Sequence, residues 1–206
     1  SKGLVIRDLA TGSVVSANLF GRAPDQSQSA DNTTSIELID VSQVTVGDEG
    51  VARNRFFSGT TAILVAGANA DFNRLYANQF IATTASTAID LSTSTAPDGI
   101  TANDVNDVDS GANEGQNTPI LTDGAAGIGT ITINGTLDVL AGIAAPVGYR
   151  LAFYRSVGCN DLSGSGNGRR GDLYLGSVEQ AFASNAENFP VSINISPATG
   201  FITPTP

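Results

Sequence analysis

The segment SIELID at residues 35–40 recurs in altered form along the first hundred residues of the chain. Its counterparts are GLVIRD at 3–8, AILVAG at 62–67 and AIDLST at 88–93. The starts of successive copies are separated by 32, 27 and 26 residues, which is a usual length for one unit of a solenoid. Ile36 and Leu38, like Ile63 and Val65, stand two residues apart, which places both members of each pair on one face of a strand. The repeat therefore predicts short strands stacked in a parallel sheet.

A second repeated element lies between these copies and places Asn two residues before Phe. It occurs in SANLFG, ARNRFF and YANQFI. Equivalent residues in a parallel stack lie about 4.8 Å apart, so the repeats predict three columns of like side chains. These columns are aliphatic (Ile36, Ile63, Ile89), aromatic (Phe20, Phe56, Phe80) and amide (Asn18, Asn54, Asn78). The Asn residues either bond from rung to rung or serve as exposed turn formers, and the sequence leaves both interpretations open.

Residue types in this half favour strands, because Thr, Val, Ile, Ser, Asn and Gly all disfavour the interior of a helix. The long polar stretch at 22–33 blurs the period and is interpreted as a loop that leaves one corner of a coil. A β-sandwich whose strands are similar by coincidence is the competing interpretation. We expect an all-β protein in which residues 1–95 form about three to four coils of a parallel solenoid.

The rhythm of the sequence changes after Pro119. Six stretches alternate at period two and are separated by Gly, Asn or Pro, which predicts a β-sandwich at 120–206. The stretches are ILTDG, GTITINGTLDV, YRLAFYRS, DLYLGSVEQAF, FPVSINIS and FITPTP. The candidate core residues are Ile131, Ile133, Leu137, Leu151, Phe153, Leu173, Leu175, Val191, Ile193 and Ile195.

Residues 96–119 form a polar, acidic stretch with little apolar periodicity, and we interpret it as an exit loop or linker. It contains Asp104, Asp107, Asp109 and Glu114. Ca²⁺ takes six to eight oxygen ligands, and carboxylates at nearly alternate positions followed by Gly supply part of such a set. The spacing does not match the twelve-residue EF-hand loop. These four residues are the candidate ligands of a structural Ca²⁺ ion, and the alternative is a solvated linker with Asx turns.

Composition excludes several classes of function. The chain has 10 Lys and Arg against 20 Asp and Glu, a net charge of −10, which argues against binding to nucleic acid or to anionic membranes. No apolar run approaches the roughly 20 residues of a membrane helix. The absence of His from the sequence removes Ser-His-Asp catalysis and His-based zinc sites. The single Cys159 cannot form an internal disulfide, and no cofactor is required.

Two segments carry a resemblance to a known family. The segment 88–122, AIDLSTSTAPDGITANDVNDVDSGANEGQNTPILT, resembles the exit from the last coil in bacterial secreted proteins with right-handed parallel β-helix repeats. The segment 135–177, which leads into a lone Cys and ends on a Leu-Gly-Ser strand, is similar to the Ig-like domain that follows in that family. The resemblance implies a right-handed parallel β-helix at 1–95, an Ig-like sandwich at 120–206 and a location at the bacterial cell surface or outside the cell. Members carry more coils and a further strand after their counterpart of FITPTP.

These features lead to a structural function as the first hypothesis. We expect an extracellular surface module that either continues in a longer chain or self-associates, forming a filament by end stacking of the β-helix or by strand donation. The first alternative is an adhesin or glycan-binding module. The second is a polysaccharide-degrading β-helix enzyme, for which Arg53, Arg55 and Arg74 are the candidate basic residues; we expect no enzymatic activity. A phage or virus fibre fits the same features.

Overall fold

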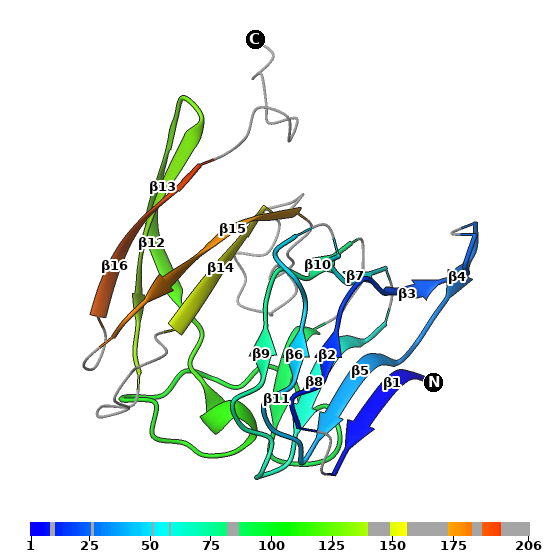
Figure 1. The fold of residues 1–206 in the computed structure, drawn as a ribbon. Coiled ribbons are helices and arrows are strands. Elements are labelled where there is room, and N and C mark those ends of the chain that lie inside the picture. Colours follow the sequence, from blue (N-terminus) through cyan, green and yellow to red (C-terminus); the bar gives the residue numbers. More distant parts are fainter. Residues whose placement is uncertain are drawn as a thin grey trace.

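The computed structural model describes residues 1–8, 11–25, 27–50, 52–57, 59–81, 87–139, 149–155, 173–182 and 187–194. Within these ranges the regular structure is β-strand, apart from one 3₁₀ turn, η1, at Ala112–Gly115. The prediction of an all-β protein is therefore confirmed. Among the described residues there is no helix of the length and apolar character that a membrane span requires. The strands fall into two groups, which Figure 1 shows side by side.

The first group contains three parallel sheets that the chain visits in a repeating order. The first sheet has the order β1 (Lys2–Arg7), β5 (Thr34–Ile39), β8 (Thr61–Ala66) and β11 (Thr87–Ser92). The second contains β2 (Val14–Val15), β6 (Thr45–Val46) and β9 (Arg74–Leu75). The third contains β10 (Gln79–Phe80), β7 (Arg55–Phe56) and β3 (Leu19–Arg22), with β4 (Ser29–Ala30) antiparallel beside β3. One strand from each sheet makes one rung, so the first rung comprises β1, β2 and β3.

The aliphatic column predicted from the repeats is confirmed by the register of the first sheet. Ile36 pairs with Ile63, and Ile63 pairs with Ile89. Leu4 of β1 pairs with Ile36 and extends the column into the first rung. Ile36 and Ile63 are fully buried, whereas Leu4 and Ile89 at the two ends of the column are partly buried. Parallel pairing therefore builds the core by repeating one side-chain type along the stacking axis.

The aromatic column closes the opposite side of the same core. The ring centroids of Phe20 and Phe56 lie 5.1 Å apart with an interplanar angle of 8°, and those of Phe56 and Phe80 lie 5.3 Å apart at 15°. Phe56 is completely buried. Tyr154, from the second group of strands, lies against the end of this column with its ring centroid 6.3 Å from that of Phe80.

The Asn column is bonded from rung to rung. Asn18 Nδ2 donates to Asn54 Oδ1 at 3.0 Å, and Asn54 Nδ2 donates to Asn78 Oδ1 at 3.0 Å and to the Val15 carbonyl at 2.7 Å. Asn54 and Asn78 are buried, whereas Asn18 in the first rung is exposed. The interpretation of all three as exposed turn formers is therefore wrong, because burial of two amides inside a packed corner requires them to be satisfied by hydrogen bonds.

The second group contains two small antiparallel sheets. One has the order β12 (Ile120–Gly127), β13 (Thr130–Leu137) and β16 (Glu187–Asn194), and the other pairs β14 (Tyr149–Arg155) with β15 (Leu173–Gln180). The five strands lie at the first five of the six predicted stretches. Leu137, Leu151 and Phe153 are buried in its core, and the predicted core residues Ile133 and Leu175 pack against them. The predicted core residue Ile195 and the stretch FITPTP lie outside the described residues.

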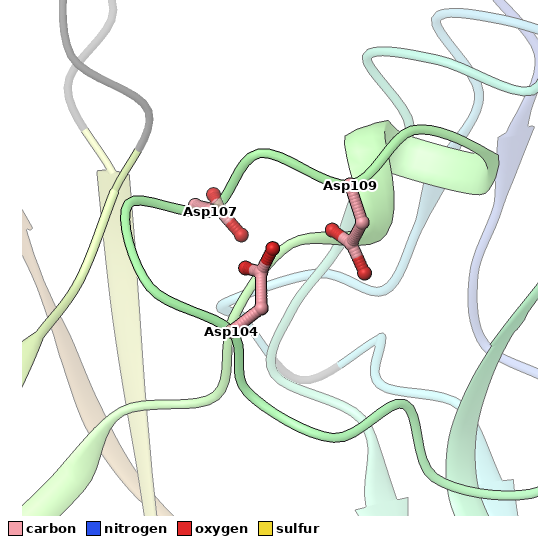
Figure 2. Close-up of side chains that lie close together, drawn as sticks. All are labelled: Asp104, Asp107 and Asp109. Atoms are coloured by element: carbon pink, nitrogen blue, oxygen red, sulfur yellow. The ribbon is translucent and has the colours of Figure 1, made fainter.

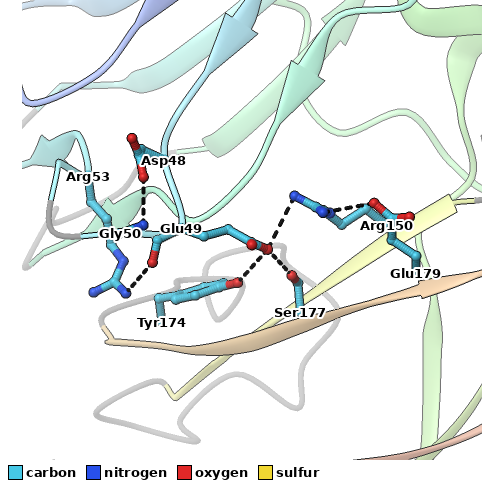
Figure 3. Close-up of polar contacts among 8 residues, drawn as sticks. All are labelled: Asp48, Glu49, Gly50, Arg53, Arg150, Tyr174, Ser177 and Glu179. Atoms are coloured by element: carbon cyan, nitrogen blue, oxygen red, sulfur yellow. Dashed lines mark hydrogen bonds and ion pairs between the residues drawn. The ribbon is translucent and has the colours of Figure 1, made fainter.

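Glu49 joins the two groups (Figure 3). Its Oε1 accepts hydrogen bonds from Ser177 Oγ and from the Tyr174 hydroxyl, the latter at 3.4 Å, and forms an ion pair with Arg150 Nη1 at 3.2 Å. Arg53, four residues further along the chain, lies with its guanidinium 4.9 Å from the Tyr174 ring centroid. These contacts connect the turn after β6 to β14 and β15, and they hold β14 and β15 against the corner of the first group.

Candidate metal centre

Three of the four predicted ligands lie together in the exit loop. The carboxylates of Asp104, Asp107 and Asp109 each offer an oxygen atom that lies within 4.8 Å of the others. Figure 2 shows the three side chains turned toward a common space beside η1. Three carboxylates of this kind supply hard oxygen ligands of the type that Ca²⁺ prefers, and water and main-chain carbonyls complete such sets in other proteins.

Asn117 holds the loop in this shape by contacts at both of its ends. Its main-chain N–H donates to Asp107 Oδ1 at 2.8 Å, its Oδ1 accepts from the Asp104 N–H at 2.9 Å, and its Nδ2 donates to the Asp104 carbonyl at 2.9 Å. The Asn106 N–H donates to Asp138 Oδ2 at 3.0 Å, which ties the turn to the end of β13. Asn106 and Asp107 both adopt positive φ, a conformation that Asn and Asp tolerate better than most residues. The local sequence therefore suits the turn that brings the carboxylates together.

The electrostatics of this cluster favour a cation. Asp107 is only 3% exposed, and the Oδ1 atoms of Asp104 and Asp109 are shielded from solvent without a hydrogen-bond partner. Burial raises the pKa of the Asp109 carboxyl above its usual range, and the charge of Asp104 raises it further. Neighbouring negative charges in a partly desolvated loop are costly unless a cation or protons offset them.

Glu114, the fourth predicted ligand, does not join the cluster. Its side chain is exposed and it lies within η1, where its main-chain N–H donates to the Gly111 carbonyl at 3.0 Å. The neighbouring Asn113 donates its N–H to Ala70 at 2.8 Å, so this segment is packed under the third rung. Gly115 of the same turn lies against the Asp109 carboxylate, whereas the Glu114 side chain is exposed to solvent and is not part of the cluster.

Asp90 is an acidic residue that pattern reasoning did not single out. It is 1% exposed, its Oδ2 accepts a hydrogen bond from the Gly99 N–H at 3.1 Å, and its Oδ1 has no partner. Burial raises its pKa to about 6, the bond from Gly99 opposes this rise, and the charge of Asp98 adds to it. Asp90 pairs with Leu64 on the outer face of the first sheet, where the loop after β11 covers it. Only the folded position of that loop explains its burial.

The three carboxylates present oxygen atoms of the kind that divalent cations take as ligands. The chain matches no known family model, and no curated protein and no solved structure matches it.

Proposed function

We propose that this chain is an extracellular structural module in which a short right-handed parallel β-helix at 1–95 carries an Ig-like sandwich at 120–206. The β-helix assignment is supported by the three parallel sheets that the chain visits in a repeating order. The Ig-like assignment is supported by two antiparallel sheets that share one apolar core. The extracellular location rests on the acidic composition and on the sequence resemblance described above. The observation that supports a structural function is a first rung whose outer edge has no partner among the described residues, an edge that a second copy or further rungs of a longer chain would cover.

The first rung leaves strand edges without a described partner on their outer side. Within the described residues, β1 pairs only with β5 and β2 pairs only with β6. Val5 and Val14 are 37% and 67% exposed, although they belong to strands of the stacked sheets. Asn18 Nδ2 donates to Asn54 Oδ1, but no described group donates to Asn18 Oδ1. In this ladder, the Asn of a further rung would donate to that oxygen atom. An edge of this kind is a template for pairing with another strand.

The last rung is covered by the exit loop. The Thr101 hydroxyl donates to the Leu91 carbonyl at 2.9 Å. Asn113 takes the place of a further rung at one corner: its Oδ1 accepts from the Asn73 N–H at 3.0 Å, and its Nδ2 donates to the Asn73 carbonyl at 2.9 Å. Ala112 is buried in the same core as the Ile and Phe columns. The two ends of the stack therefore differ, since the last rung is bonded to the exit loop and the outer edges of β1 and β2 have no partner among the described residues.

This asymmetry favours a closed pair over an open filament built by end stacking. A head-to-tail filament requires the last rung of one copy to accept the first rung of the next, and the exit loop occupies that position. Two first rungs can instead pair about a twofold axis. With Val5 on the axis of an antiparallel β1–β1 pair, Leu4 faces Ile6 and Lys2 faces Asp8 of the other copy, which matches apolar with apolar and cation with anion. Strand donation at the C-terminal end concerns residues outside the described ranges.

Substitution of Val5 by Lys tests self-association. In the twofold register the two new ammonium groups face each other, so light scattering and analytical ultracentrifugation are expected to show a dimer for the unchanged chain and a monomer for Val5→Lys. Ile128→Lys, at a fully exposed position in the turn between β12 and β13, should remain dimeric. A monomer at every concentration of the unchanged chain would contradict the proposal. Ordered filaments in electron micrographs would contradict the closed pair while supporting a structural role.

We also propose that Asp104, Asp107 and Asp109 bind a structural Ca²⁺ ion. Calcium at a hundredfold excess over its Kd is expected to stabilise the fold by about 2.7 kcal/mol, because only the folded loop brings the ligands together. Asp107→Asn should abolish most of the calcium-dependent rise in Tm. The matched control Asp123→Asn, at an exposed position of β12, should retain it. Equal Tm values of the unchanged chain in CaCl₂ and in EDTA would exclude the site.

A further inference from the structure

A groove lies where the last rung, the exit loop and the second group of strands meet. It has a volume of about 470 Å³, within the range of about 300–1,000 Å³ typical of sites for small ligands. Its walls come from β9 and β11, from residues 113–119 of the exit loop, and from β14 and β15. Three segments far apart in the sequence thus form one concave surface, which the proposed structural function does not use.

Part of the polar lining of this groove is already engaged in the fold. Arg150 forms ion pairs with Glu49 and Glu179, and its guanidinium lies 4.8 Å from the ring centroid of Tyr76. The side chain of Asn117 bonds to the exit loop, and that of Asn113 bonds to the main chain of Asn73, just before β9. These groups shape the groove, and they have little remaining capacity to recognise a ligand.

Another set of polar groups faces the groove with no hydrogen bond from its side chain to any described residue. The set includes one guanidinium, two phenols, two hydroxyls and one amide. Its members are Arg74, Tyr76, Tyr149, Thr87, Thr118 and Gln116. A cluster of donors and acceptors that make no side-chain hydrogen bond to the described residues, set around one cavity, suits a ligand that carries several hydroxyl groups.

Arg74 determines the charge that such a ligand would carry. Its side chain is exposed and makes no ion pair or ring contact within the described part of the chain. The two other candidate basic residues are covered, since Arg53 stacks on Tyr174 and the guanidinium of Arg55 lies 5.0 Å from the ring centroid of Phe57. A guanidinium binds a carboxylate through two parallel hydrogen bonds, so Arg74 is suited to a carboxylate. Because the chain has a net charge of −10, it repels anions overall. Binding of an acidic ligand would therefore require a specific contact such as Arg74.

The floor of the groove is apolar. Ile89 and Leu91 of β11 contribute to it together with Ile100 of the exit loop. A sugar ring presents C–H groups on its faces and hydroxyls around its edge, so an apolar floor with polar walls fits its chemistry. We propose that this groove binds an acidic saccharide, with the carboxylate of a uronic acid unit on Arg74 and the sugar ring over the floor.

Isothermal titration calorimetry of the full chain with two disaccharides tests the proposal. The probes are cellobiouronic acid and cellobiose, which differ by one carboxylate. Cellobiouronic acid is expected to bind at least about tenfold more tightly, in line with a charge-assisted pair. Arg74→Gln should remove this difference, whereas the matched control Arg7→Gln, an exposed position on β1, should preserve it.

Chemical-shift changes supply a second measurement that does not depend on affinity alone. Cellobiouronic acid should perturb the amide signals of Thr87, Gln116 and Thr118, and it should leave those of β1 unchanged. The proposal is overturned if neither disaccharide binds, if both bind equally, or if Arg74→Gln leaves the preference intact. None of these outcomes bears on self-association, because β11, which lines the groove, and β1 of the first rung are the two outermost strands of the first sheet.

Discussion

Replacement of Phe56 by Ala is expected to lower the free energy of unfolding by about 3–5 kcal/mol, the range measured for truncation of buried aromatic residues. Phe56 is completely buried, and its ring is stacked between those of Phe20 and Phe80 at 5.1 and 5.3 Å. The substitution leaves a cavity in the middle of the column. Collapse of the rungs cannot fill it, because the hydrogen bonds of the parallel sheets set their separation. Urea denaturation followed by circular dichroism measures the change.

Phe72→Ala is the matched control for this experiment. The Phe72 side chain is 74% exposed, so its truncation should alter the free energy of unfolding by no more than about 0.5 kcal/mol. A loss of less than about 1 kcal/mol for Phe56→Ala would mean that the aromatic column does not contribute to the core as the stacked geometry indicates.

Replacement of Asn54 by Ala is expected to cost about 3 kcal/mol, because it leaves buried polar groups on both neighbouring rungs without partners. Asn54 Oδ1 accepts from the main chain and from the side chain of Asn18, at 3.1 and 3.0 Å. Its Nδ2 donates to the Val15 carbonyl and to Asn78 Oδ1, so one substitution removes four hydrogen bonds. Differential scanning calorimetry should show a marked fall in Tm.

Asn69→Ala provides the comparison, since Asn69 is exposed and only its main-chain carbonyl is used, as acceptor for the Ser42 hydroxyl. Its Tm should match that of the unchanged chain within about 2 °C. If Asn54→Ala is equally mild, the Asn column is a consequence of the turn geometry and not a source of stability.

The repeats predicted the columns correctly because, in parallel strands, residues at equivalent positions of successive repeats lie next to each other. Ile36 and Ile63 are equivalent in the repeat, and the register of β5 and β8 places them side by side. The repeats do not predict the second pair of bonded Asn residues, Asn73 and Asn113, because Asn113 belongs to the acidic exit loop and not to any copy of the repeat. Only its hydrogen bonds identify it as a substitute for a further rung.

In the acidic cluster, sequence spacing predicts some of the neighbours and tertiary packing decides the others. The proximity of Asp107 and Asp109 follows from two residues of separation, and Asp104 joins them because the turn at Asn106 brings the chain back. Glu114 has a similar sequence distance, yet η1 docks under the third rung and carries its side chain elsewhere. Spacing therefore predicts ligands within one turn, and it fails where tertiary packing redirects the chain.

Residue order alone specified the all-β character, the longer strands and the three columns, because each of these depends on alternation or on repetition along the chain. The short strands β2, β4, β6 and β9 carry no such pattern and were not predicted. The bonded last rung, the Glu49 contacts with Tyr174 and Ser177, and the groove at Arg74 depend on segments with no pattern in common. Contacts of that kind arise when two separately patterned groups of strands pack together. The positions of these contacts depend on the shapes and charges of the side chains at the junction. The repeat in the sequence does not predict them.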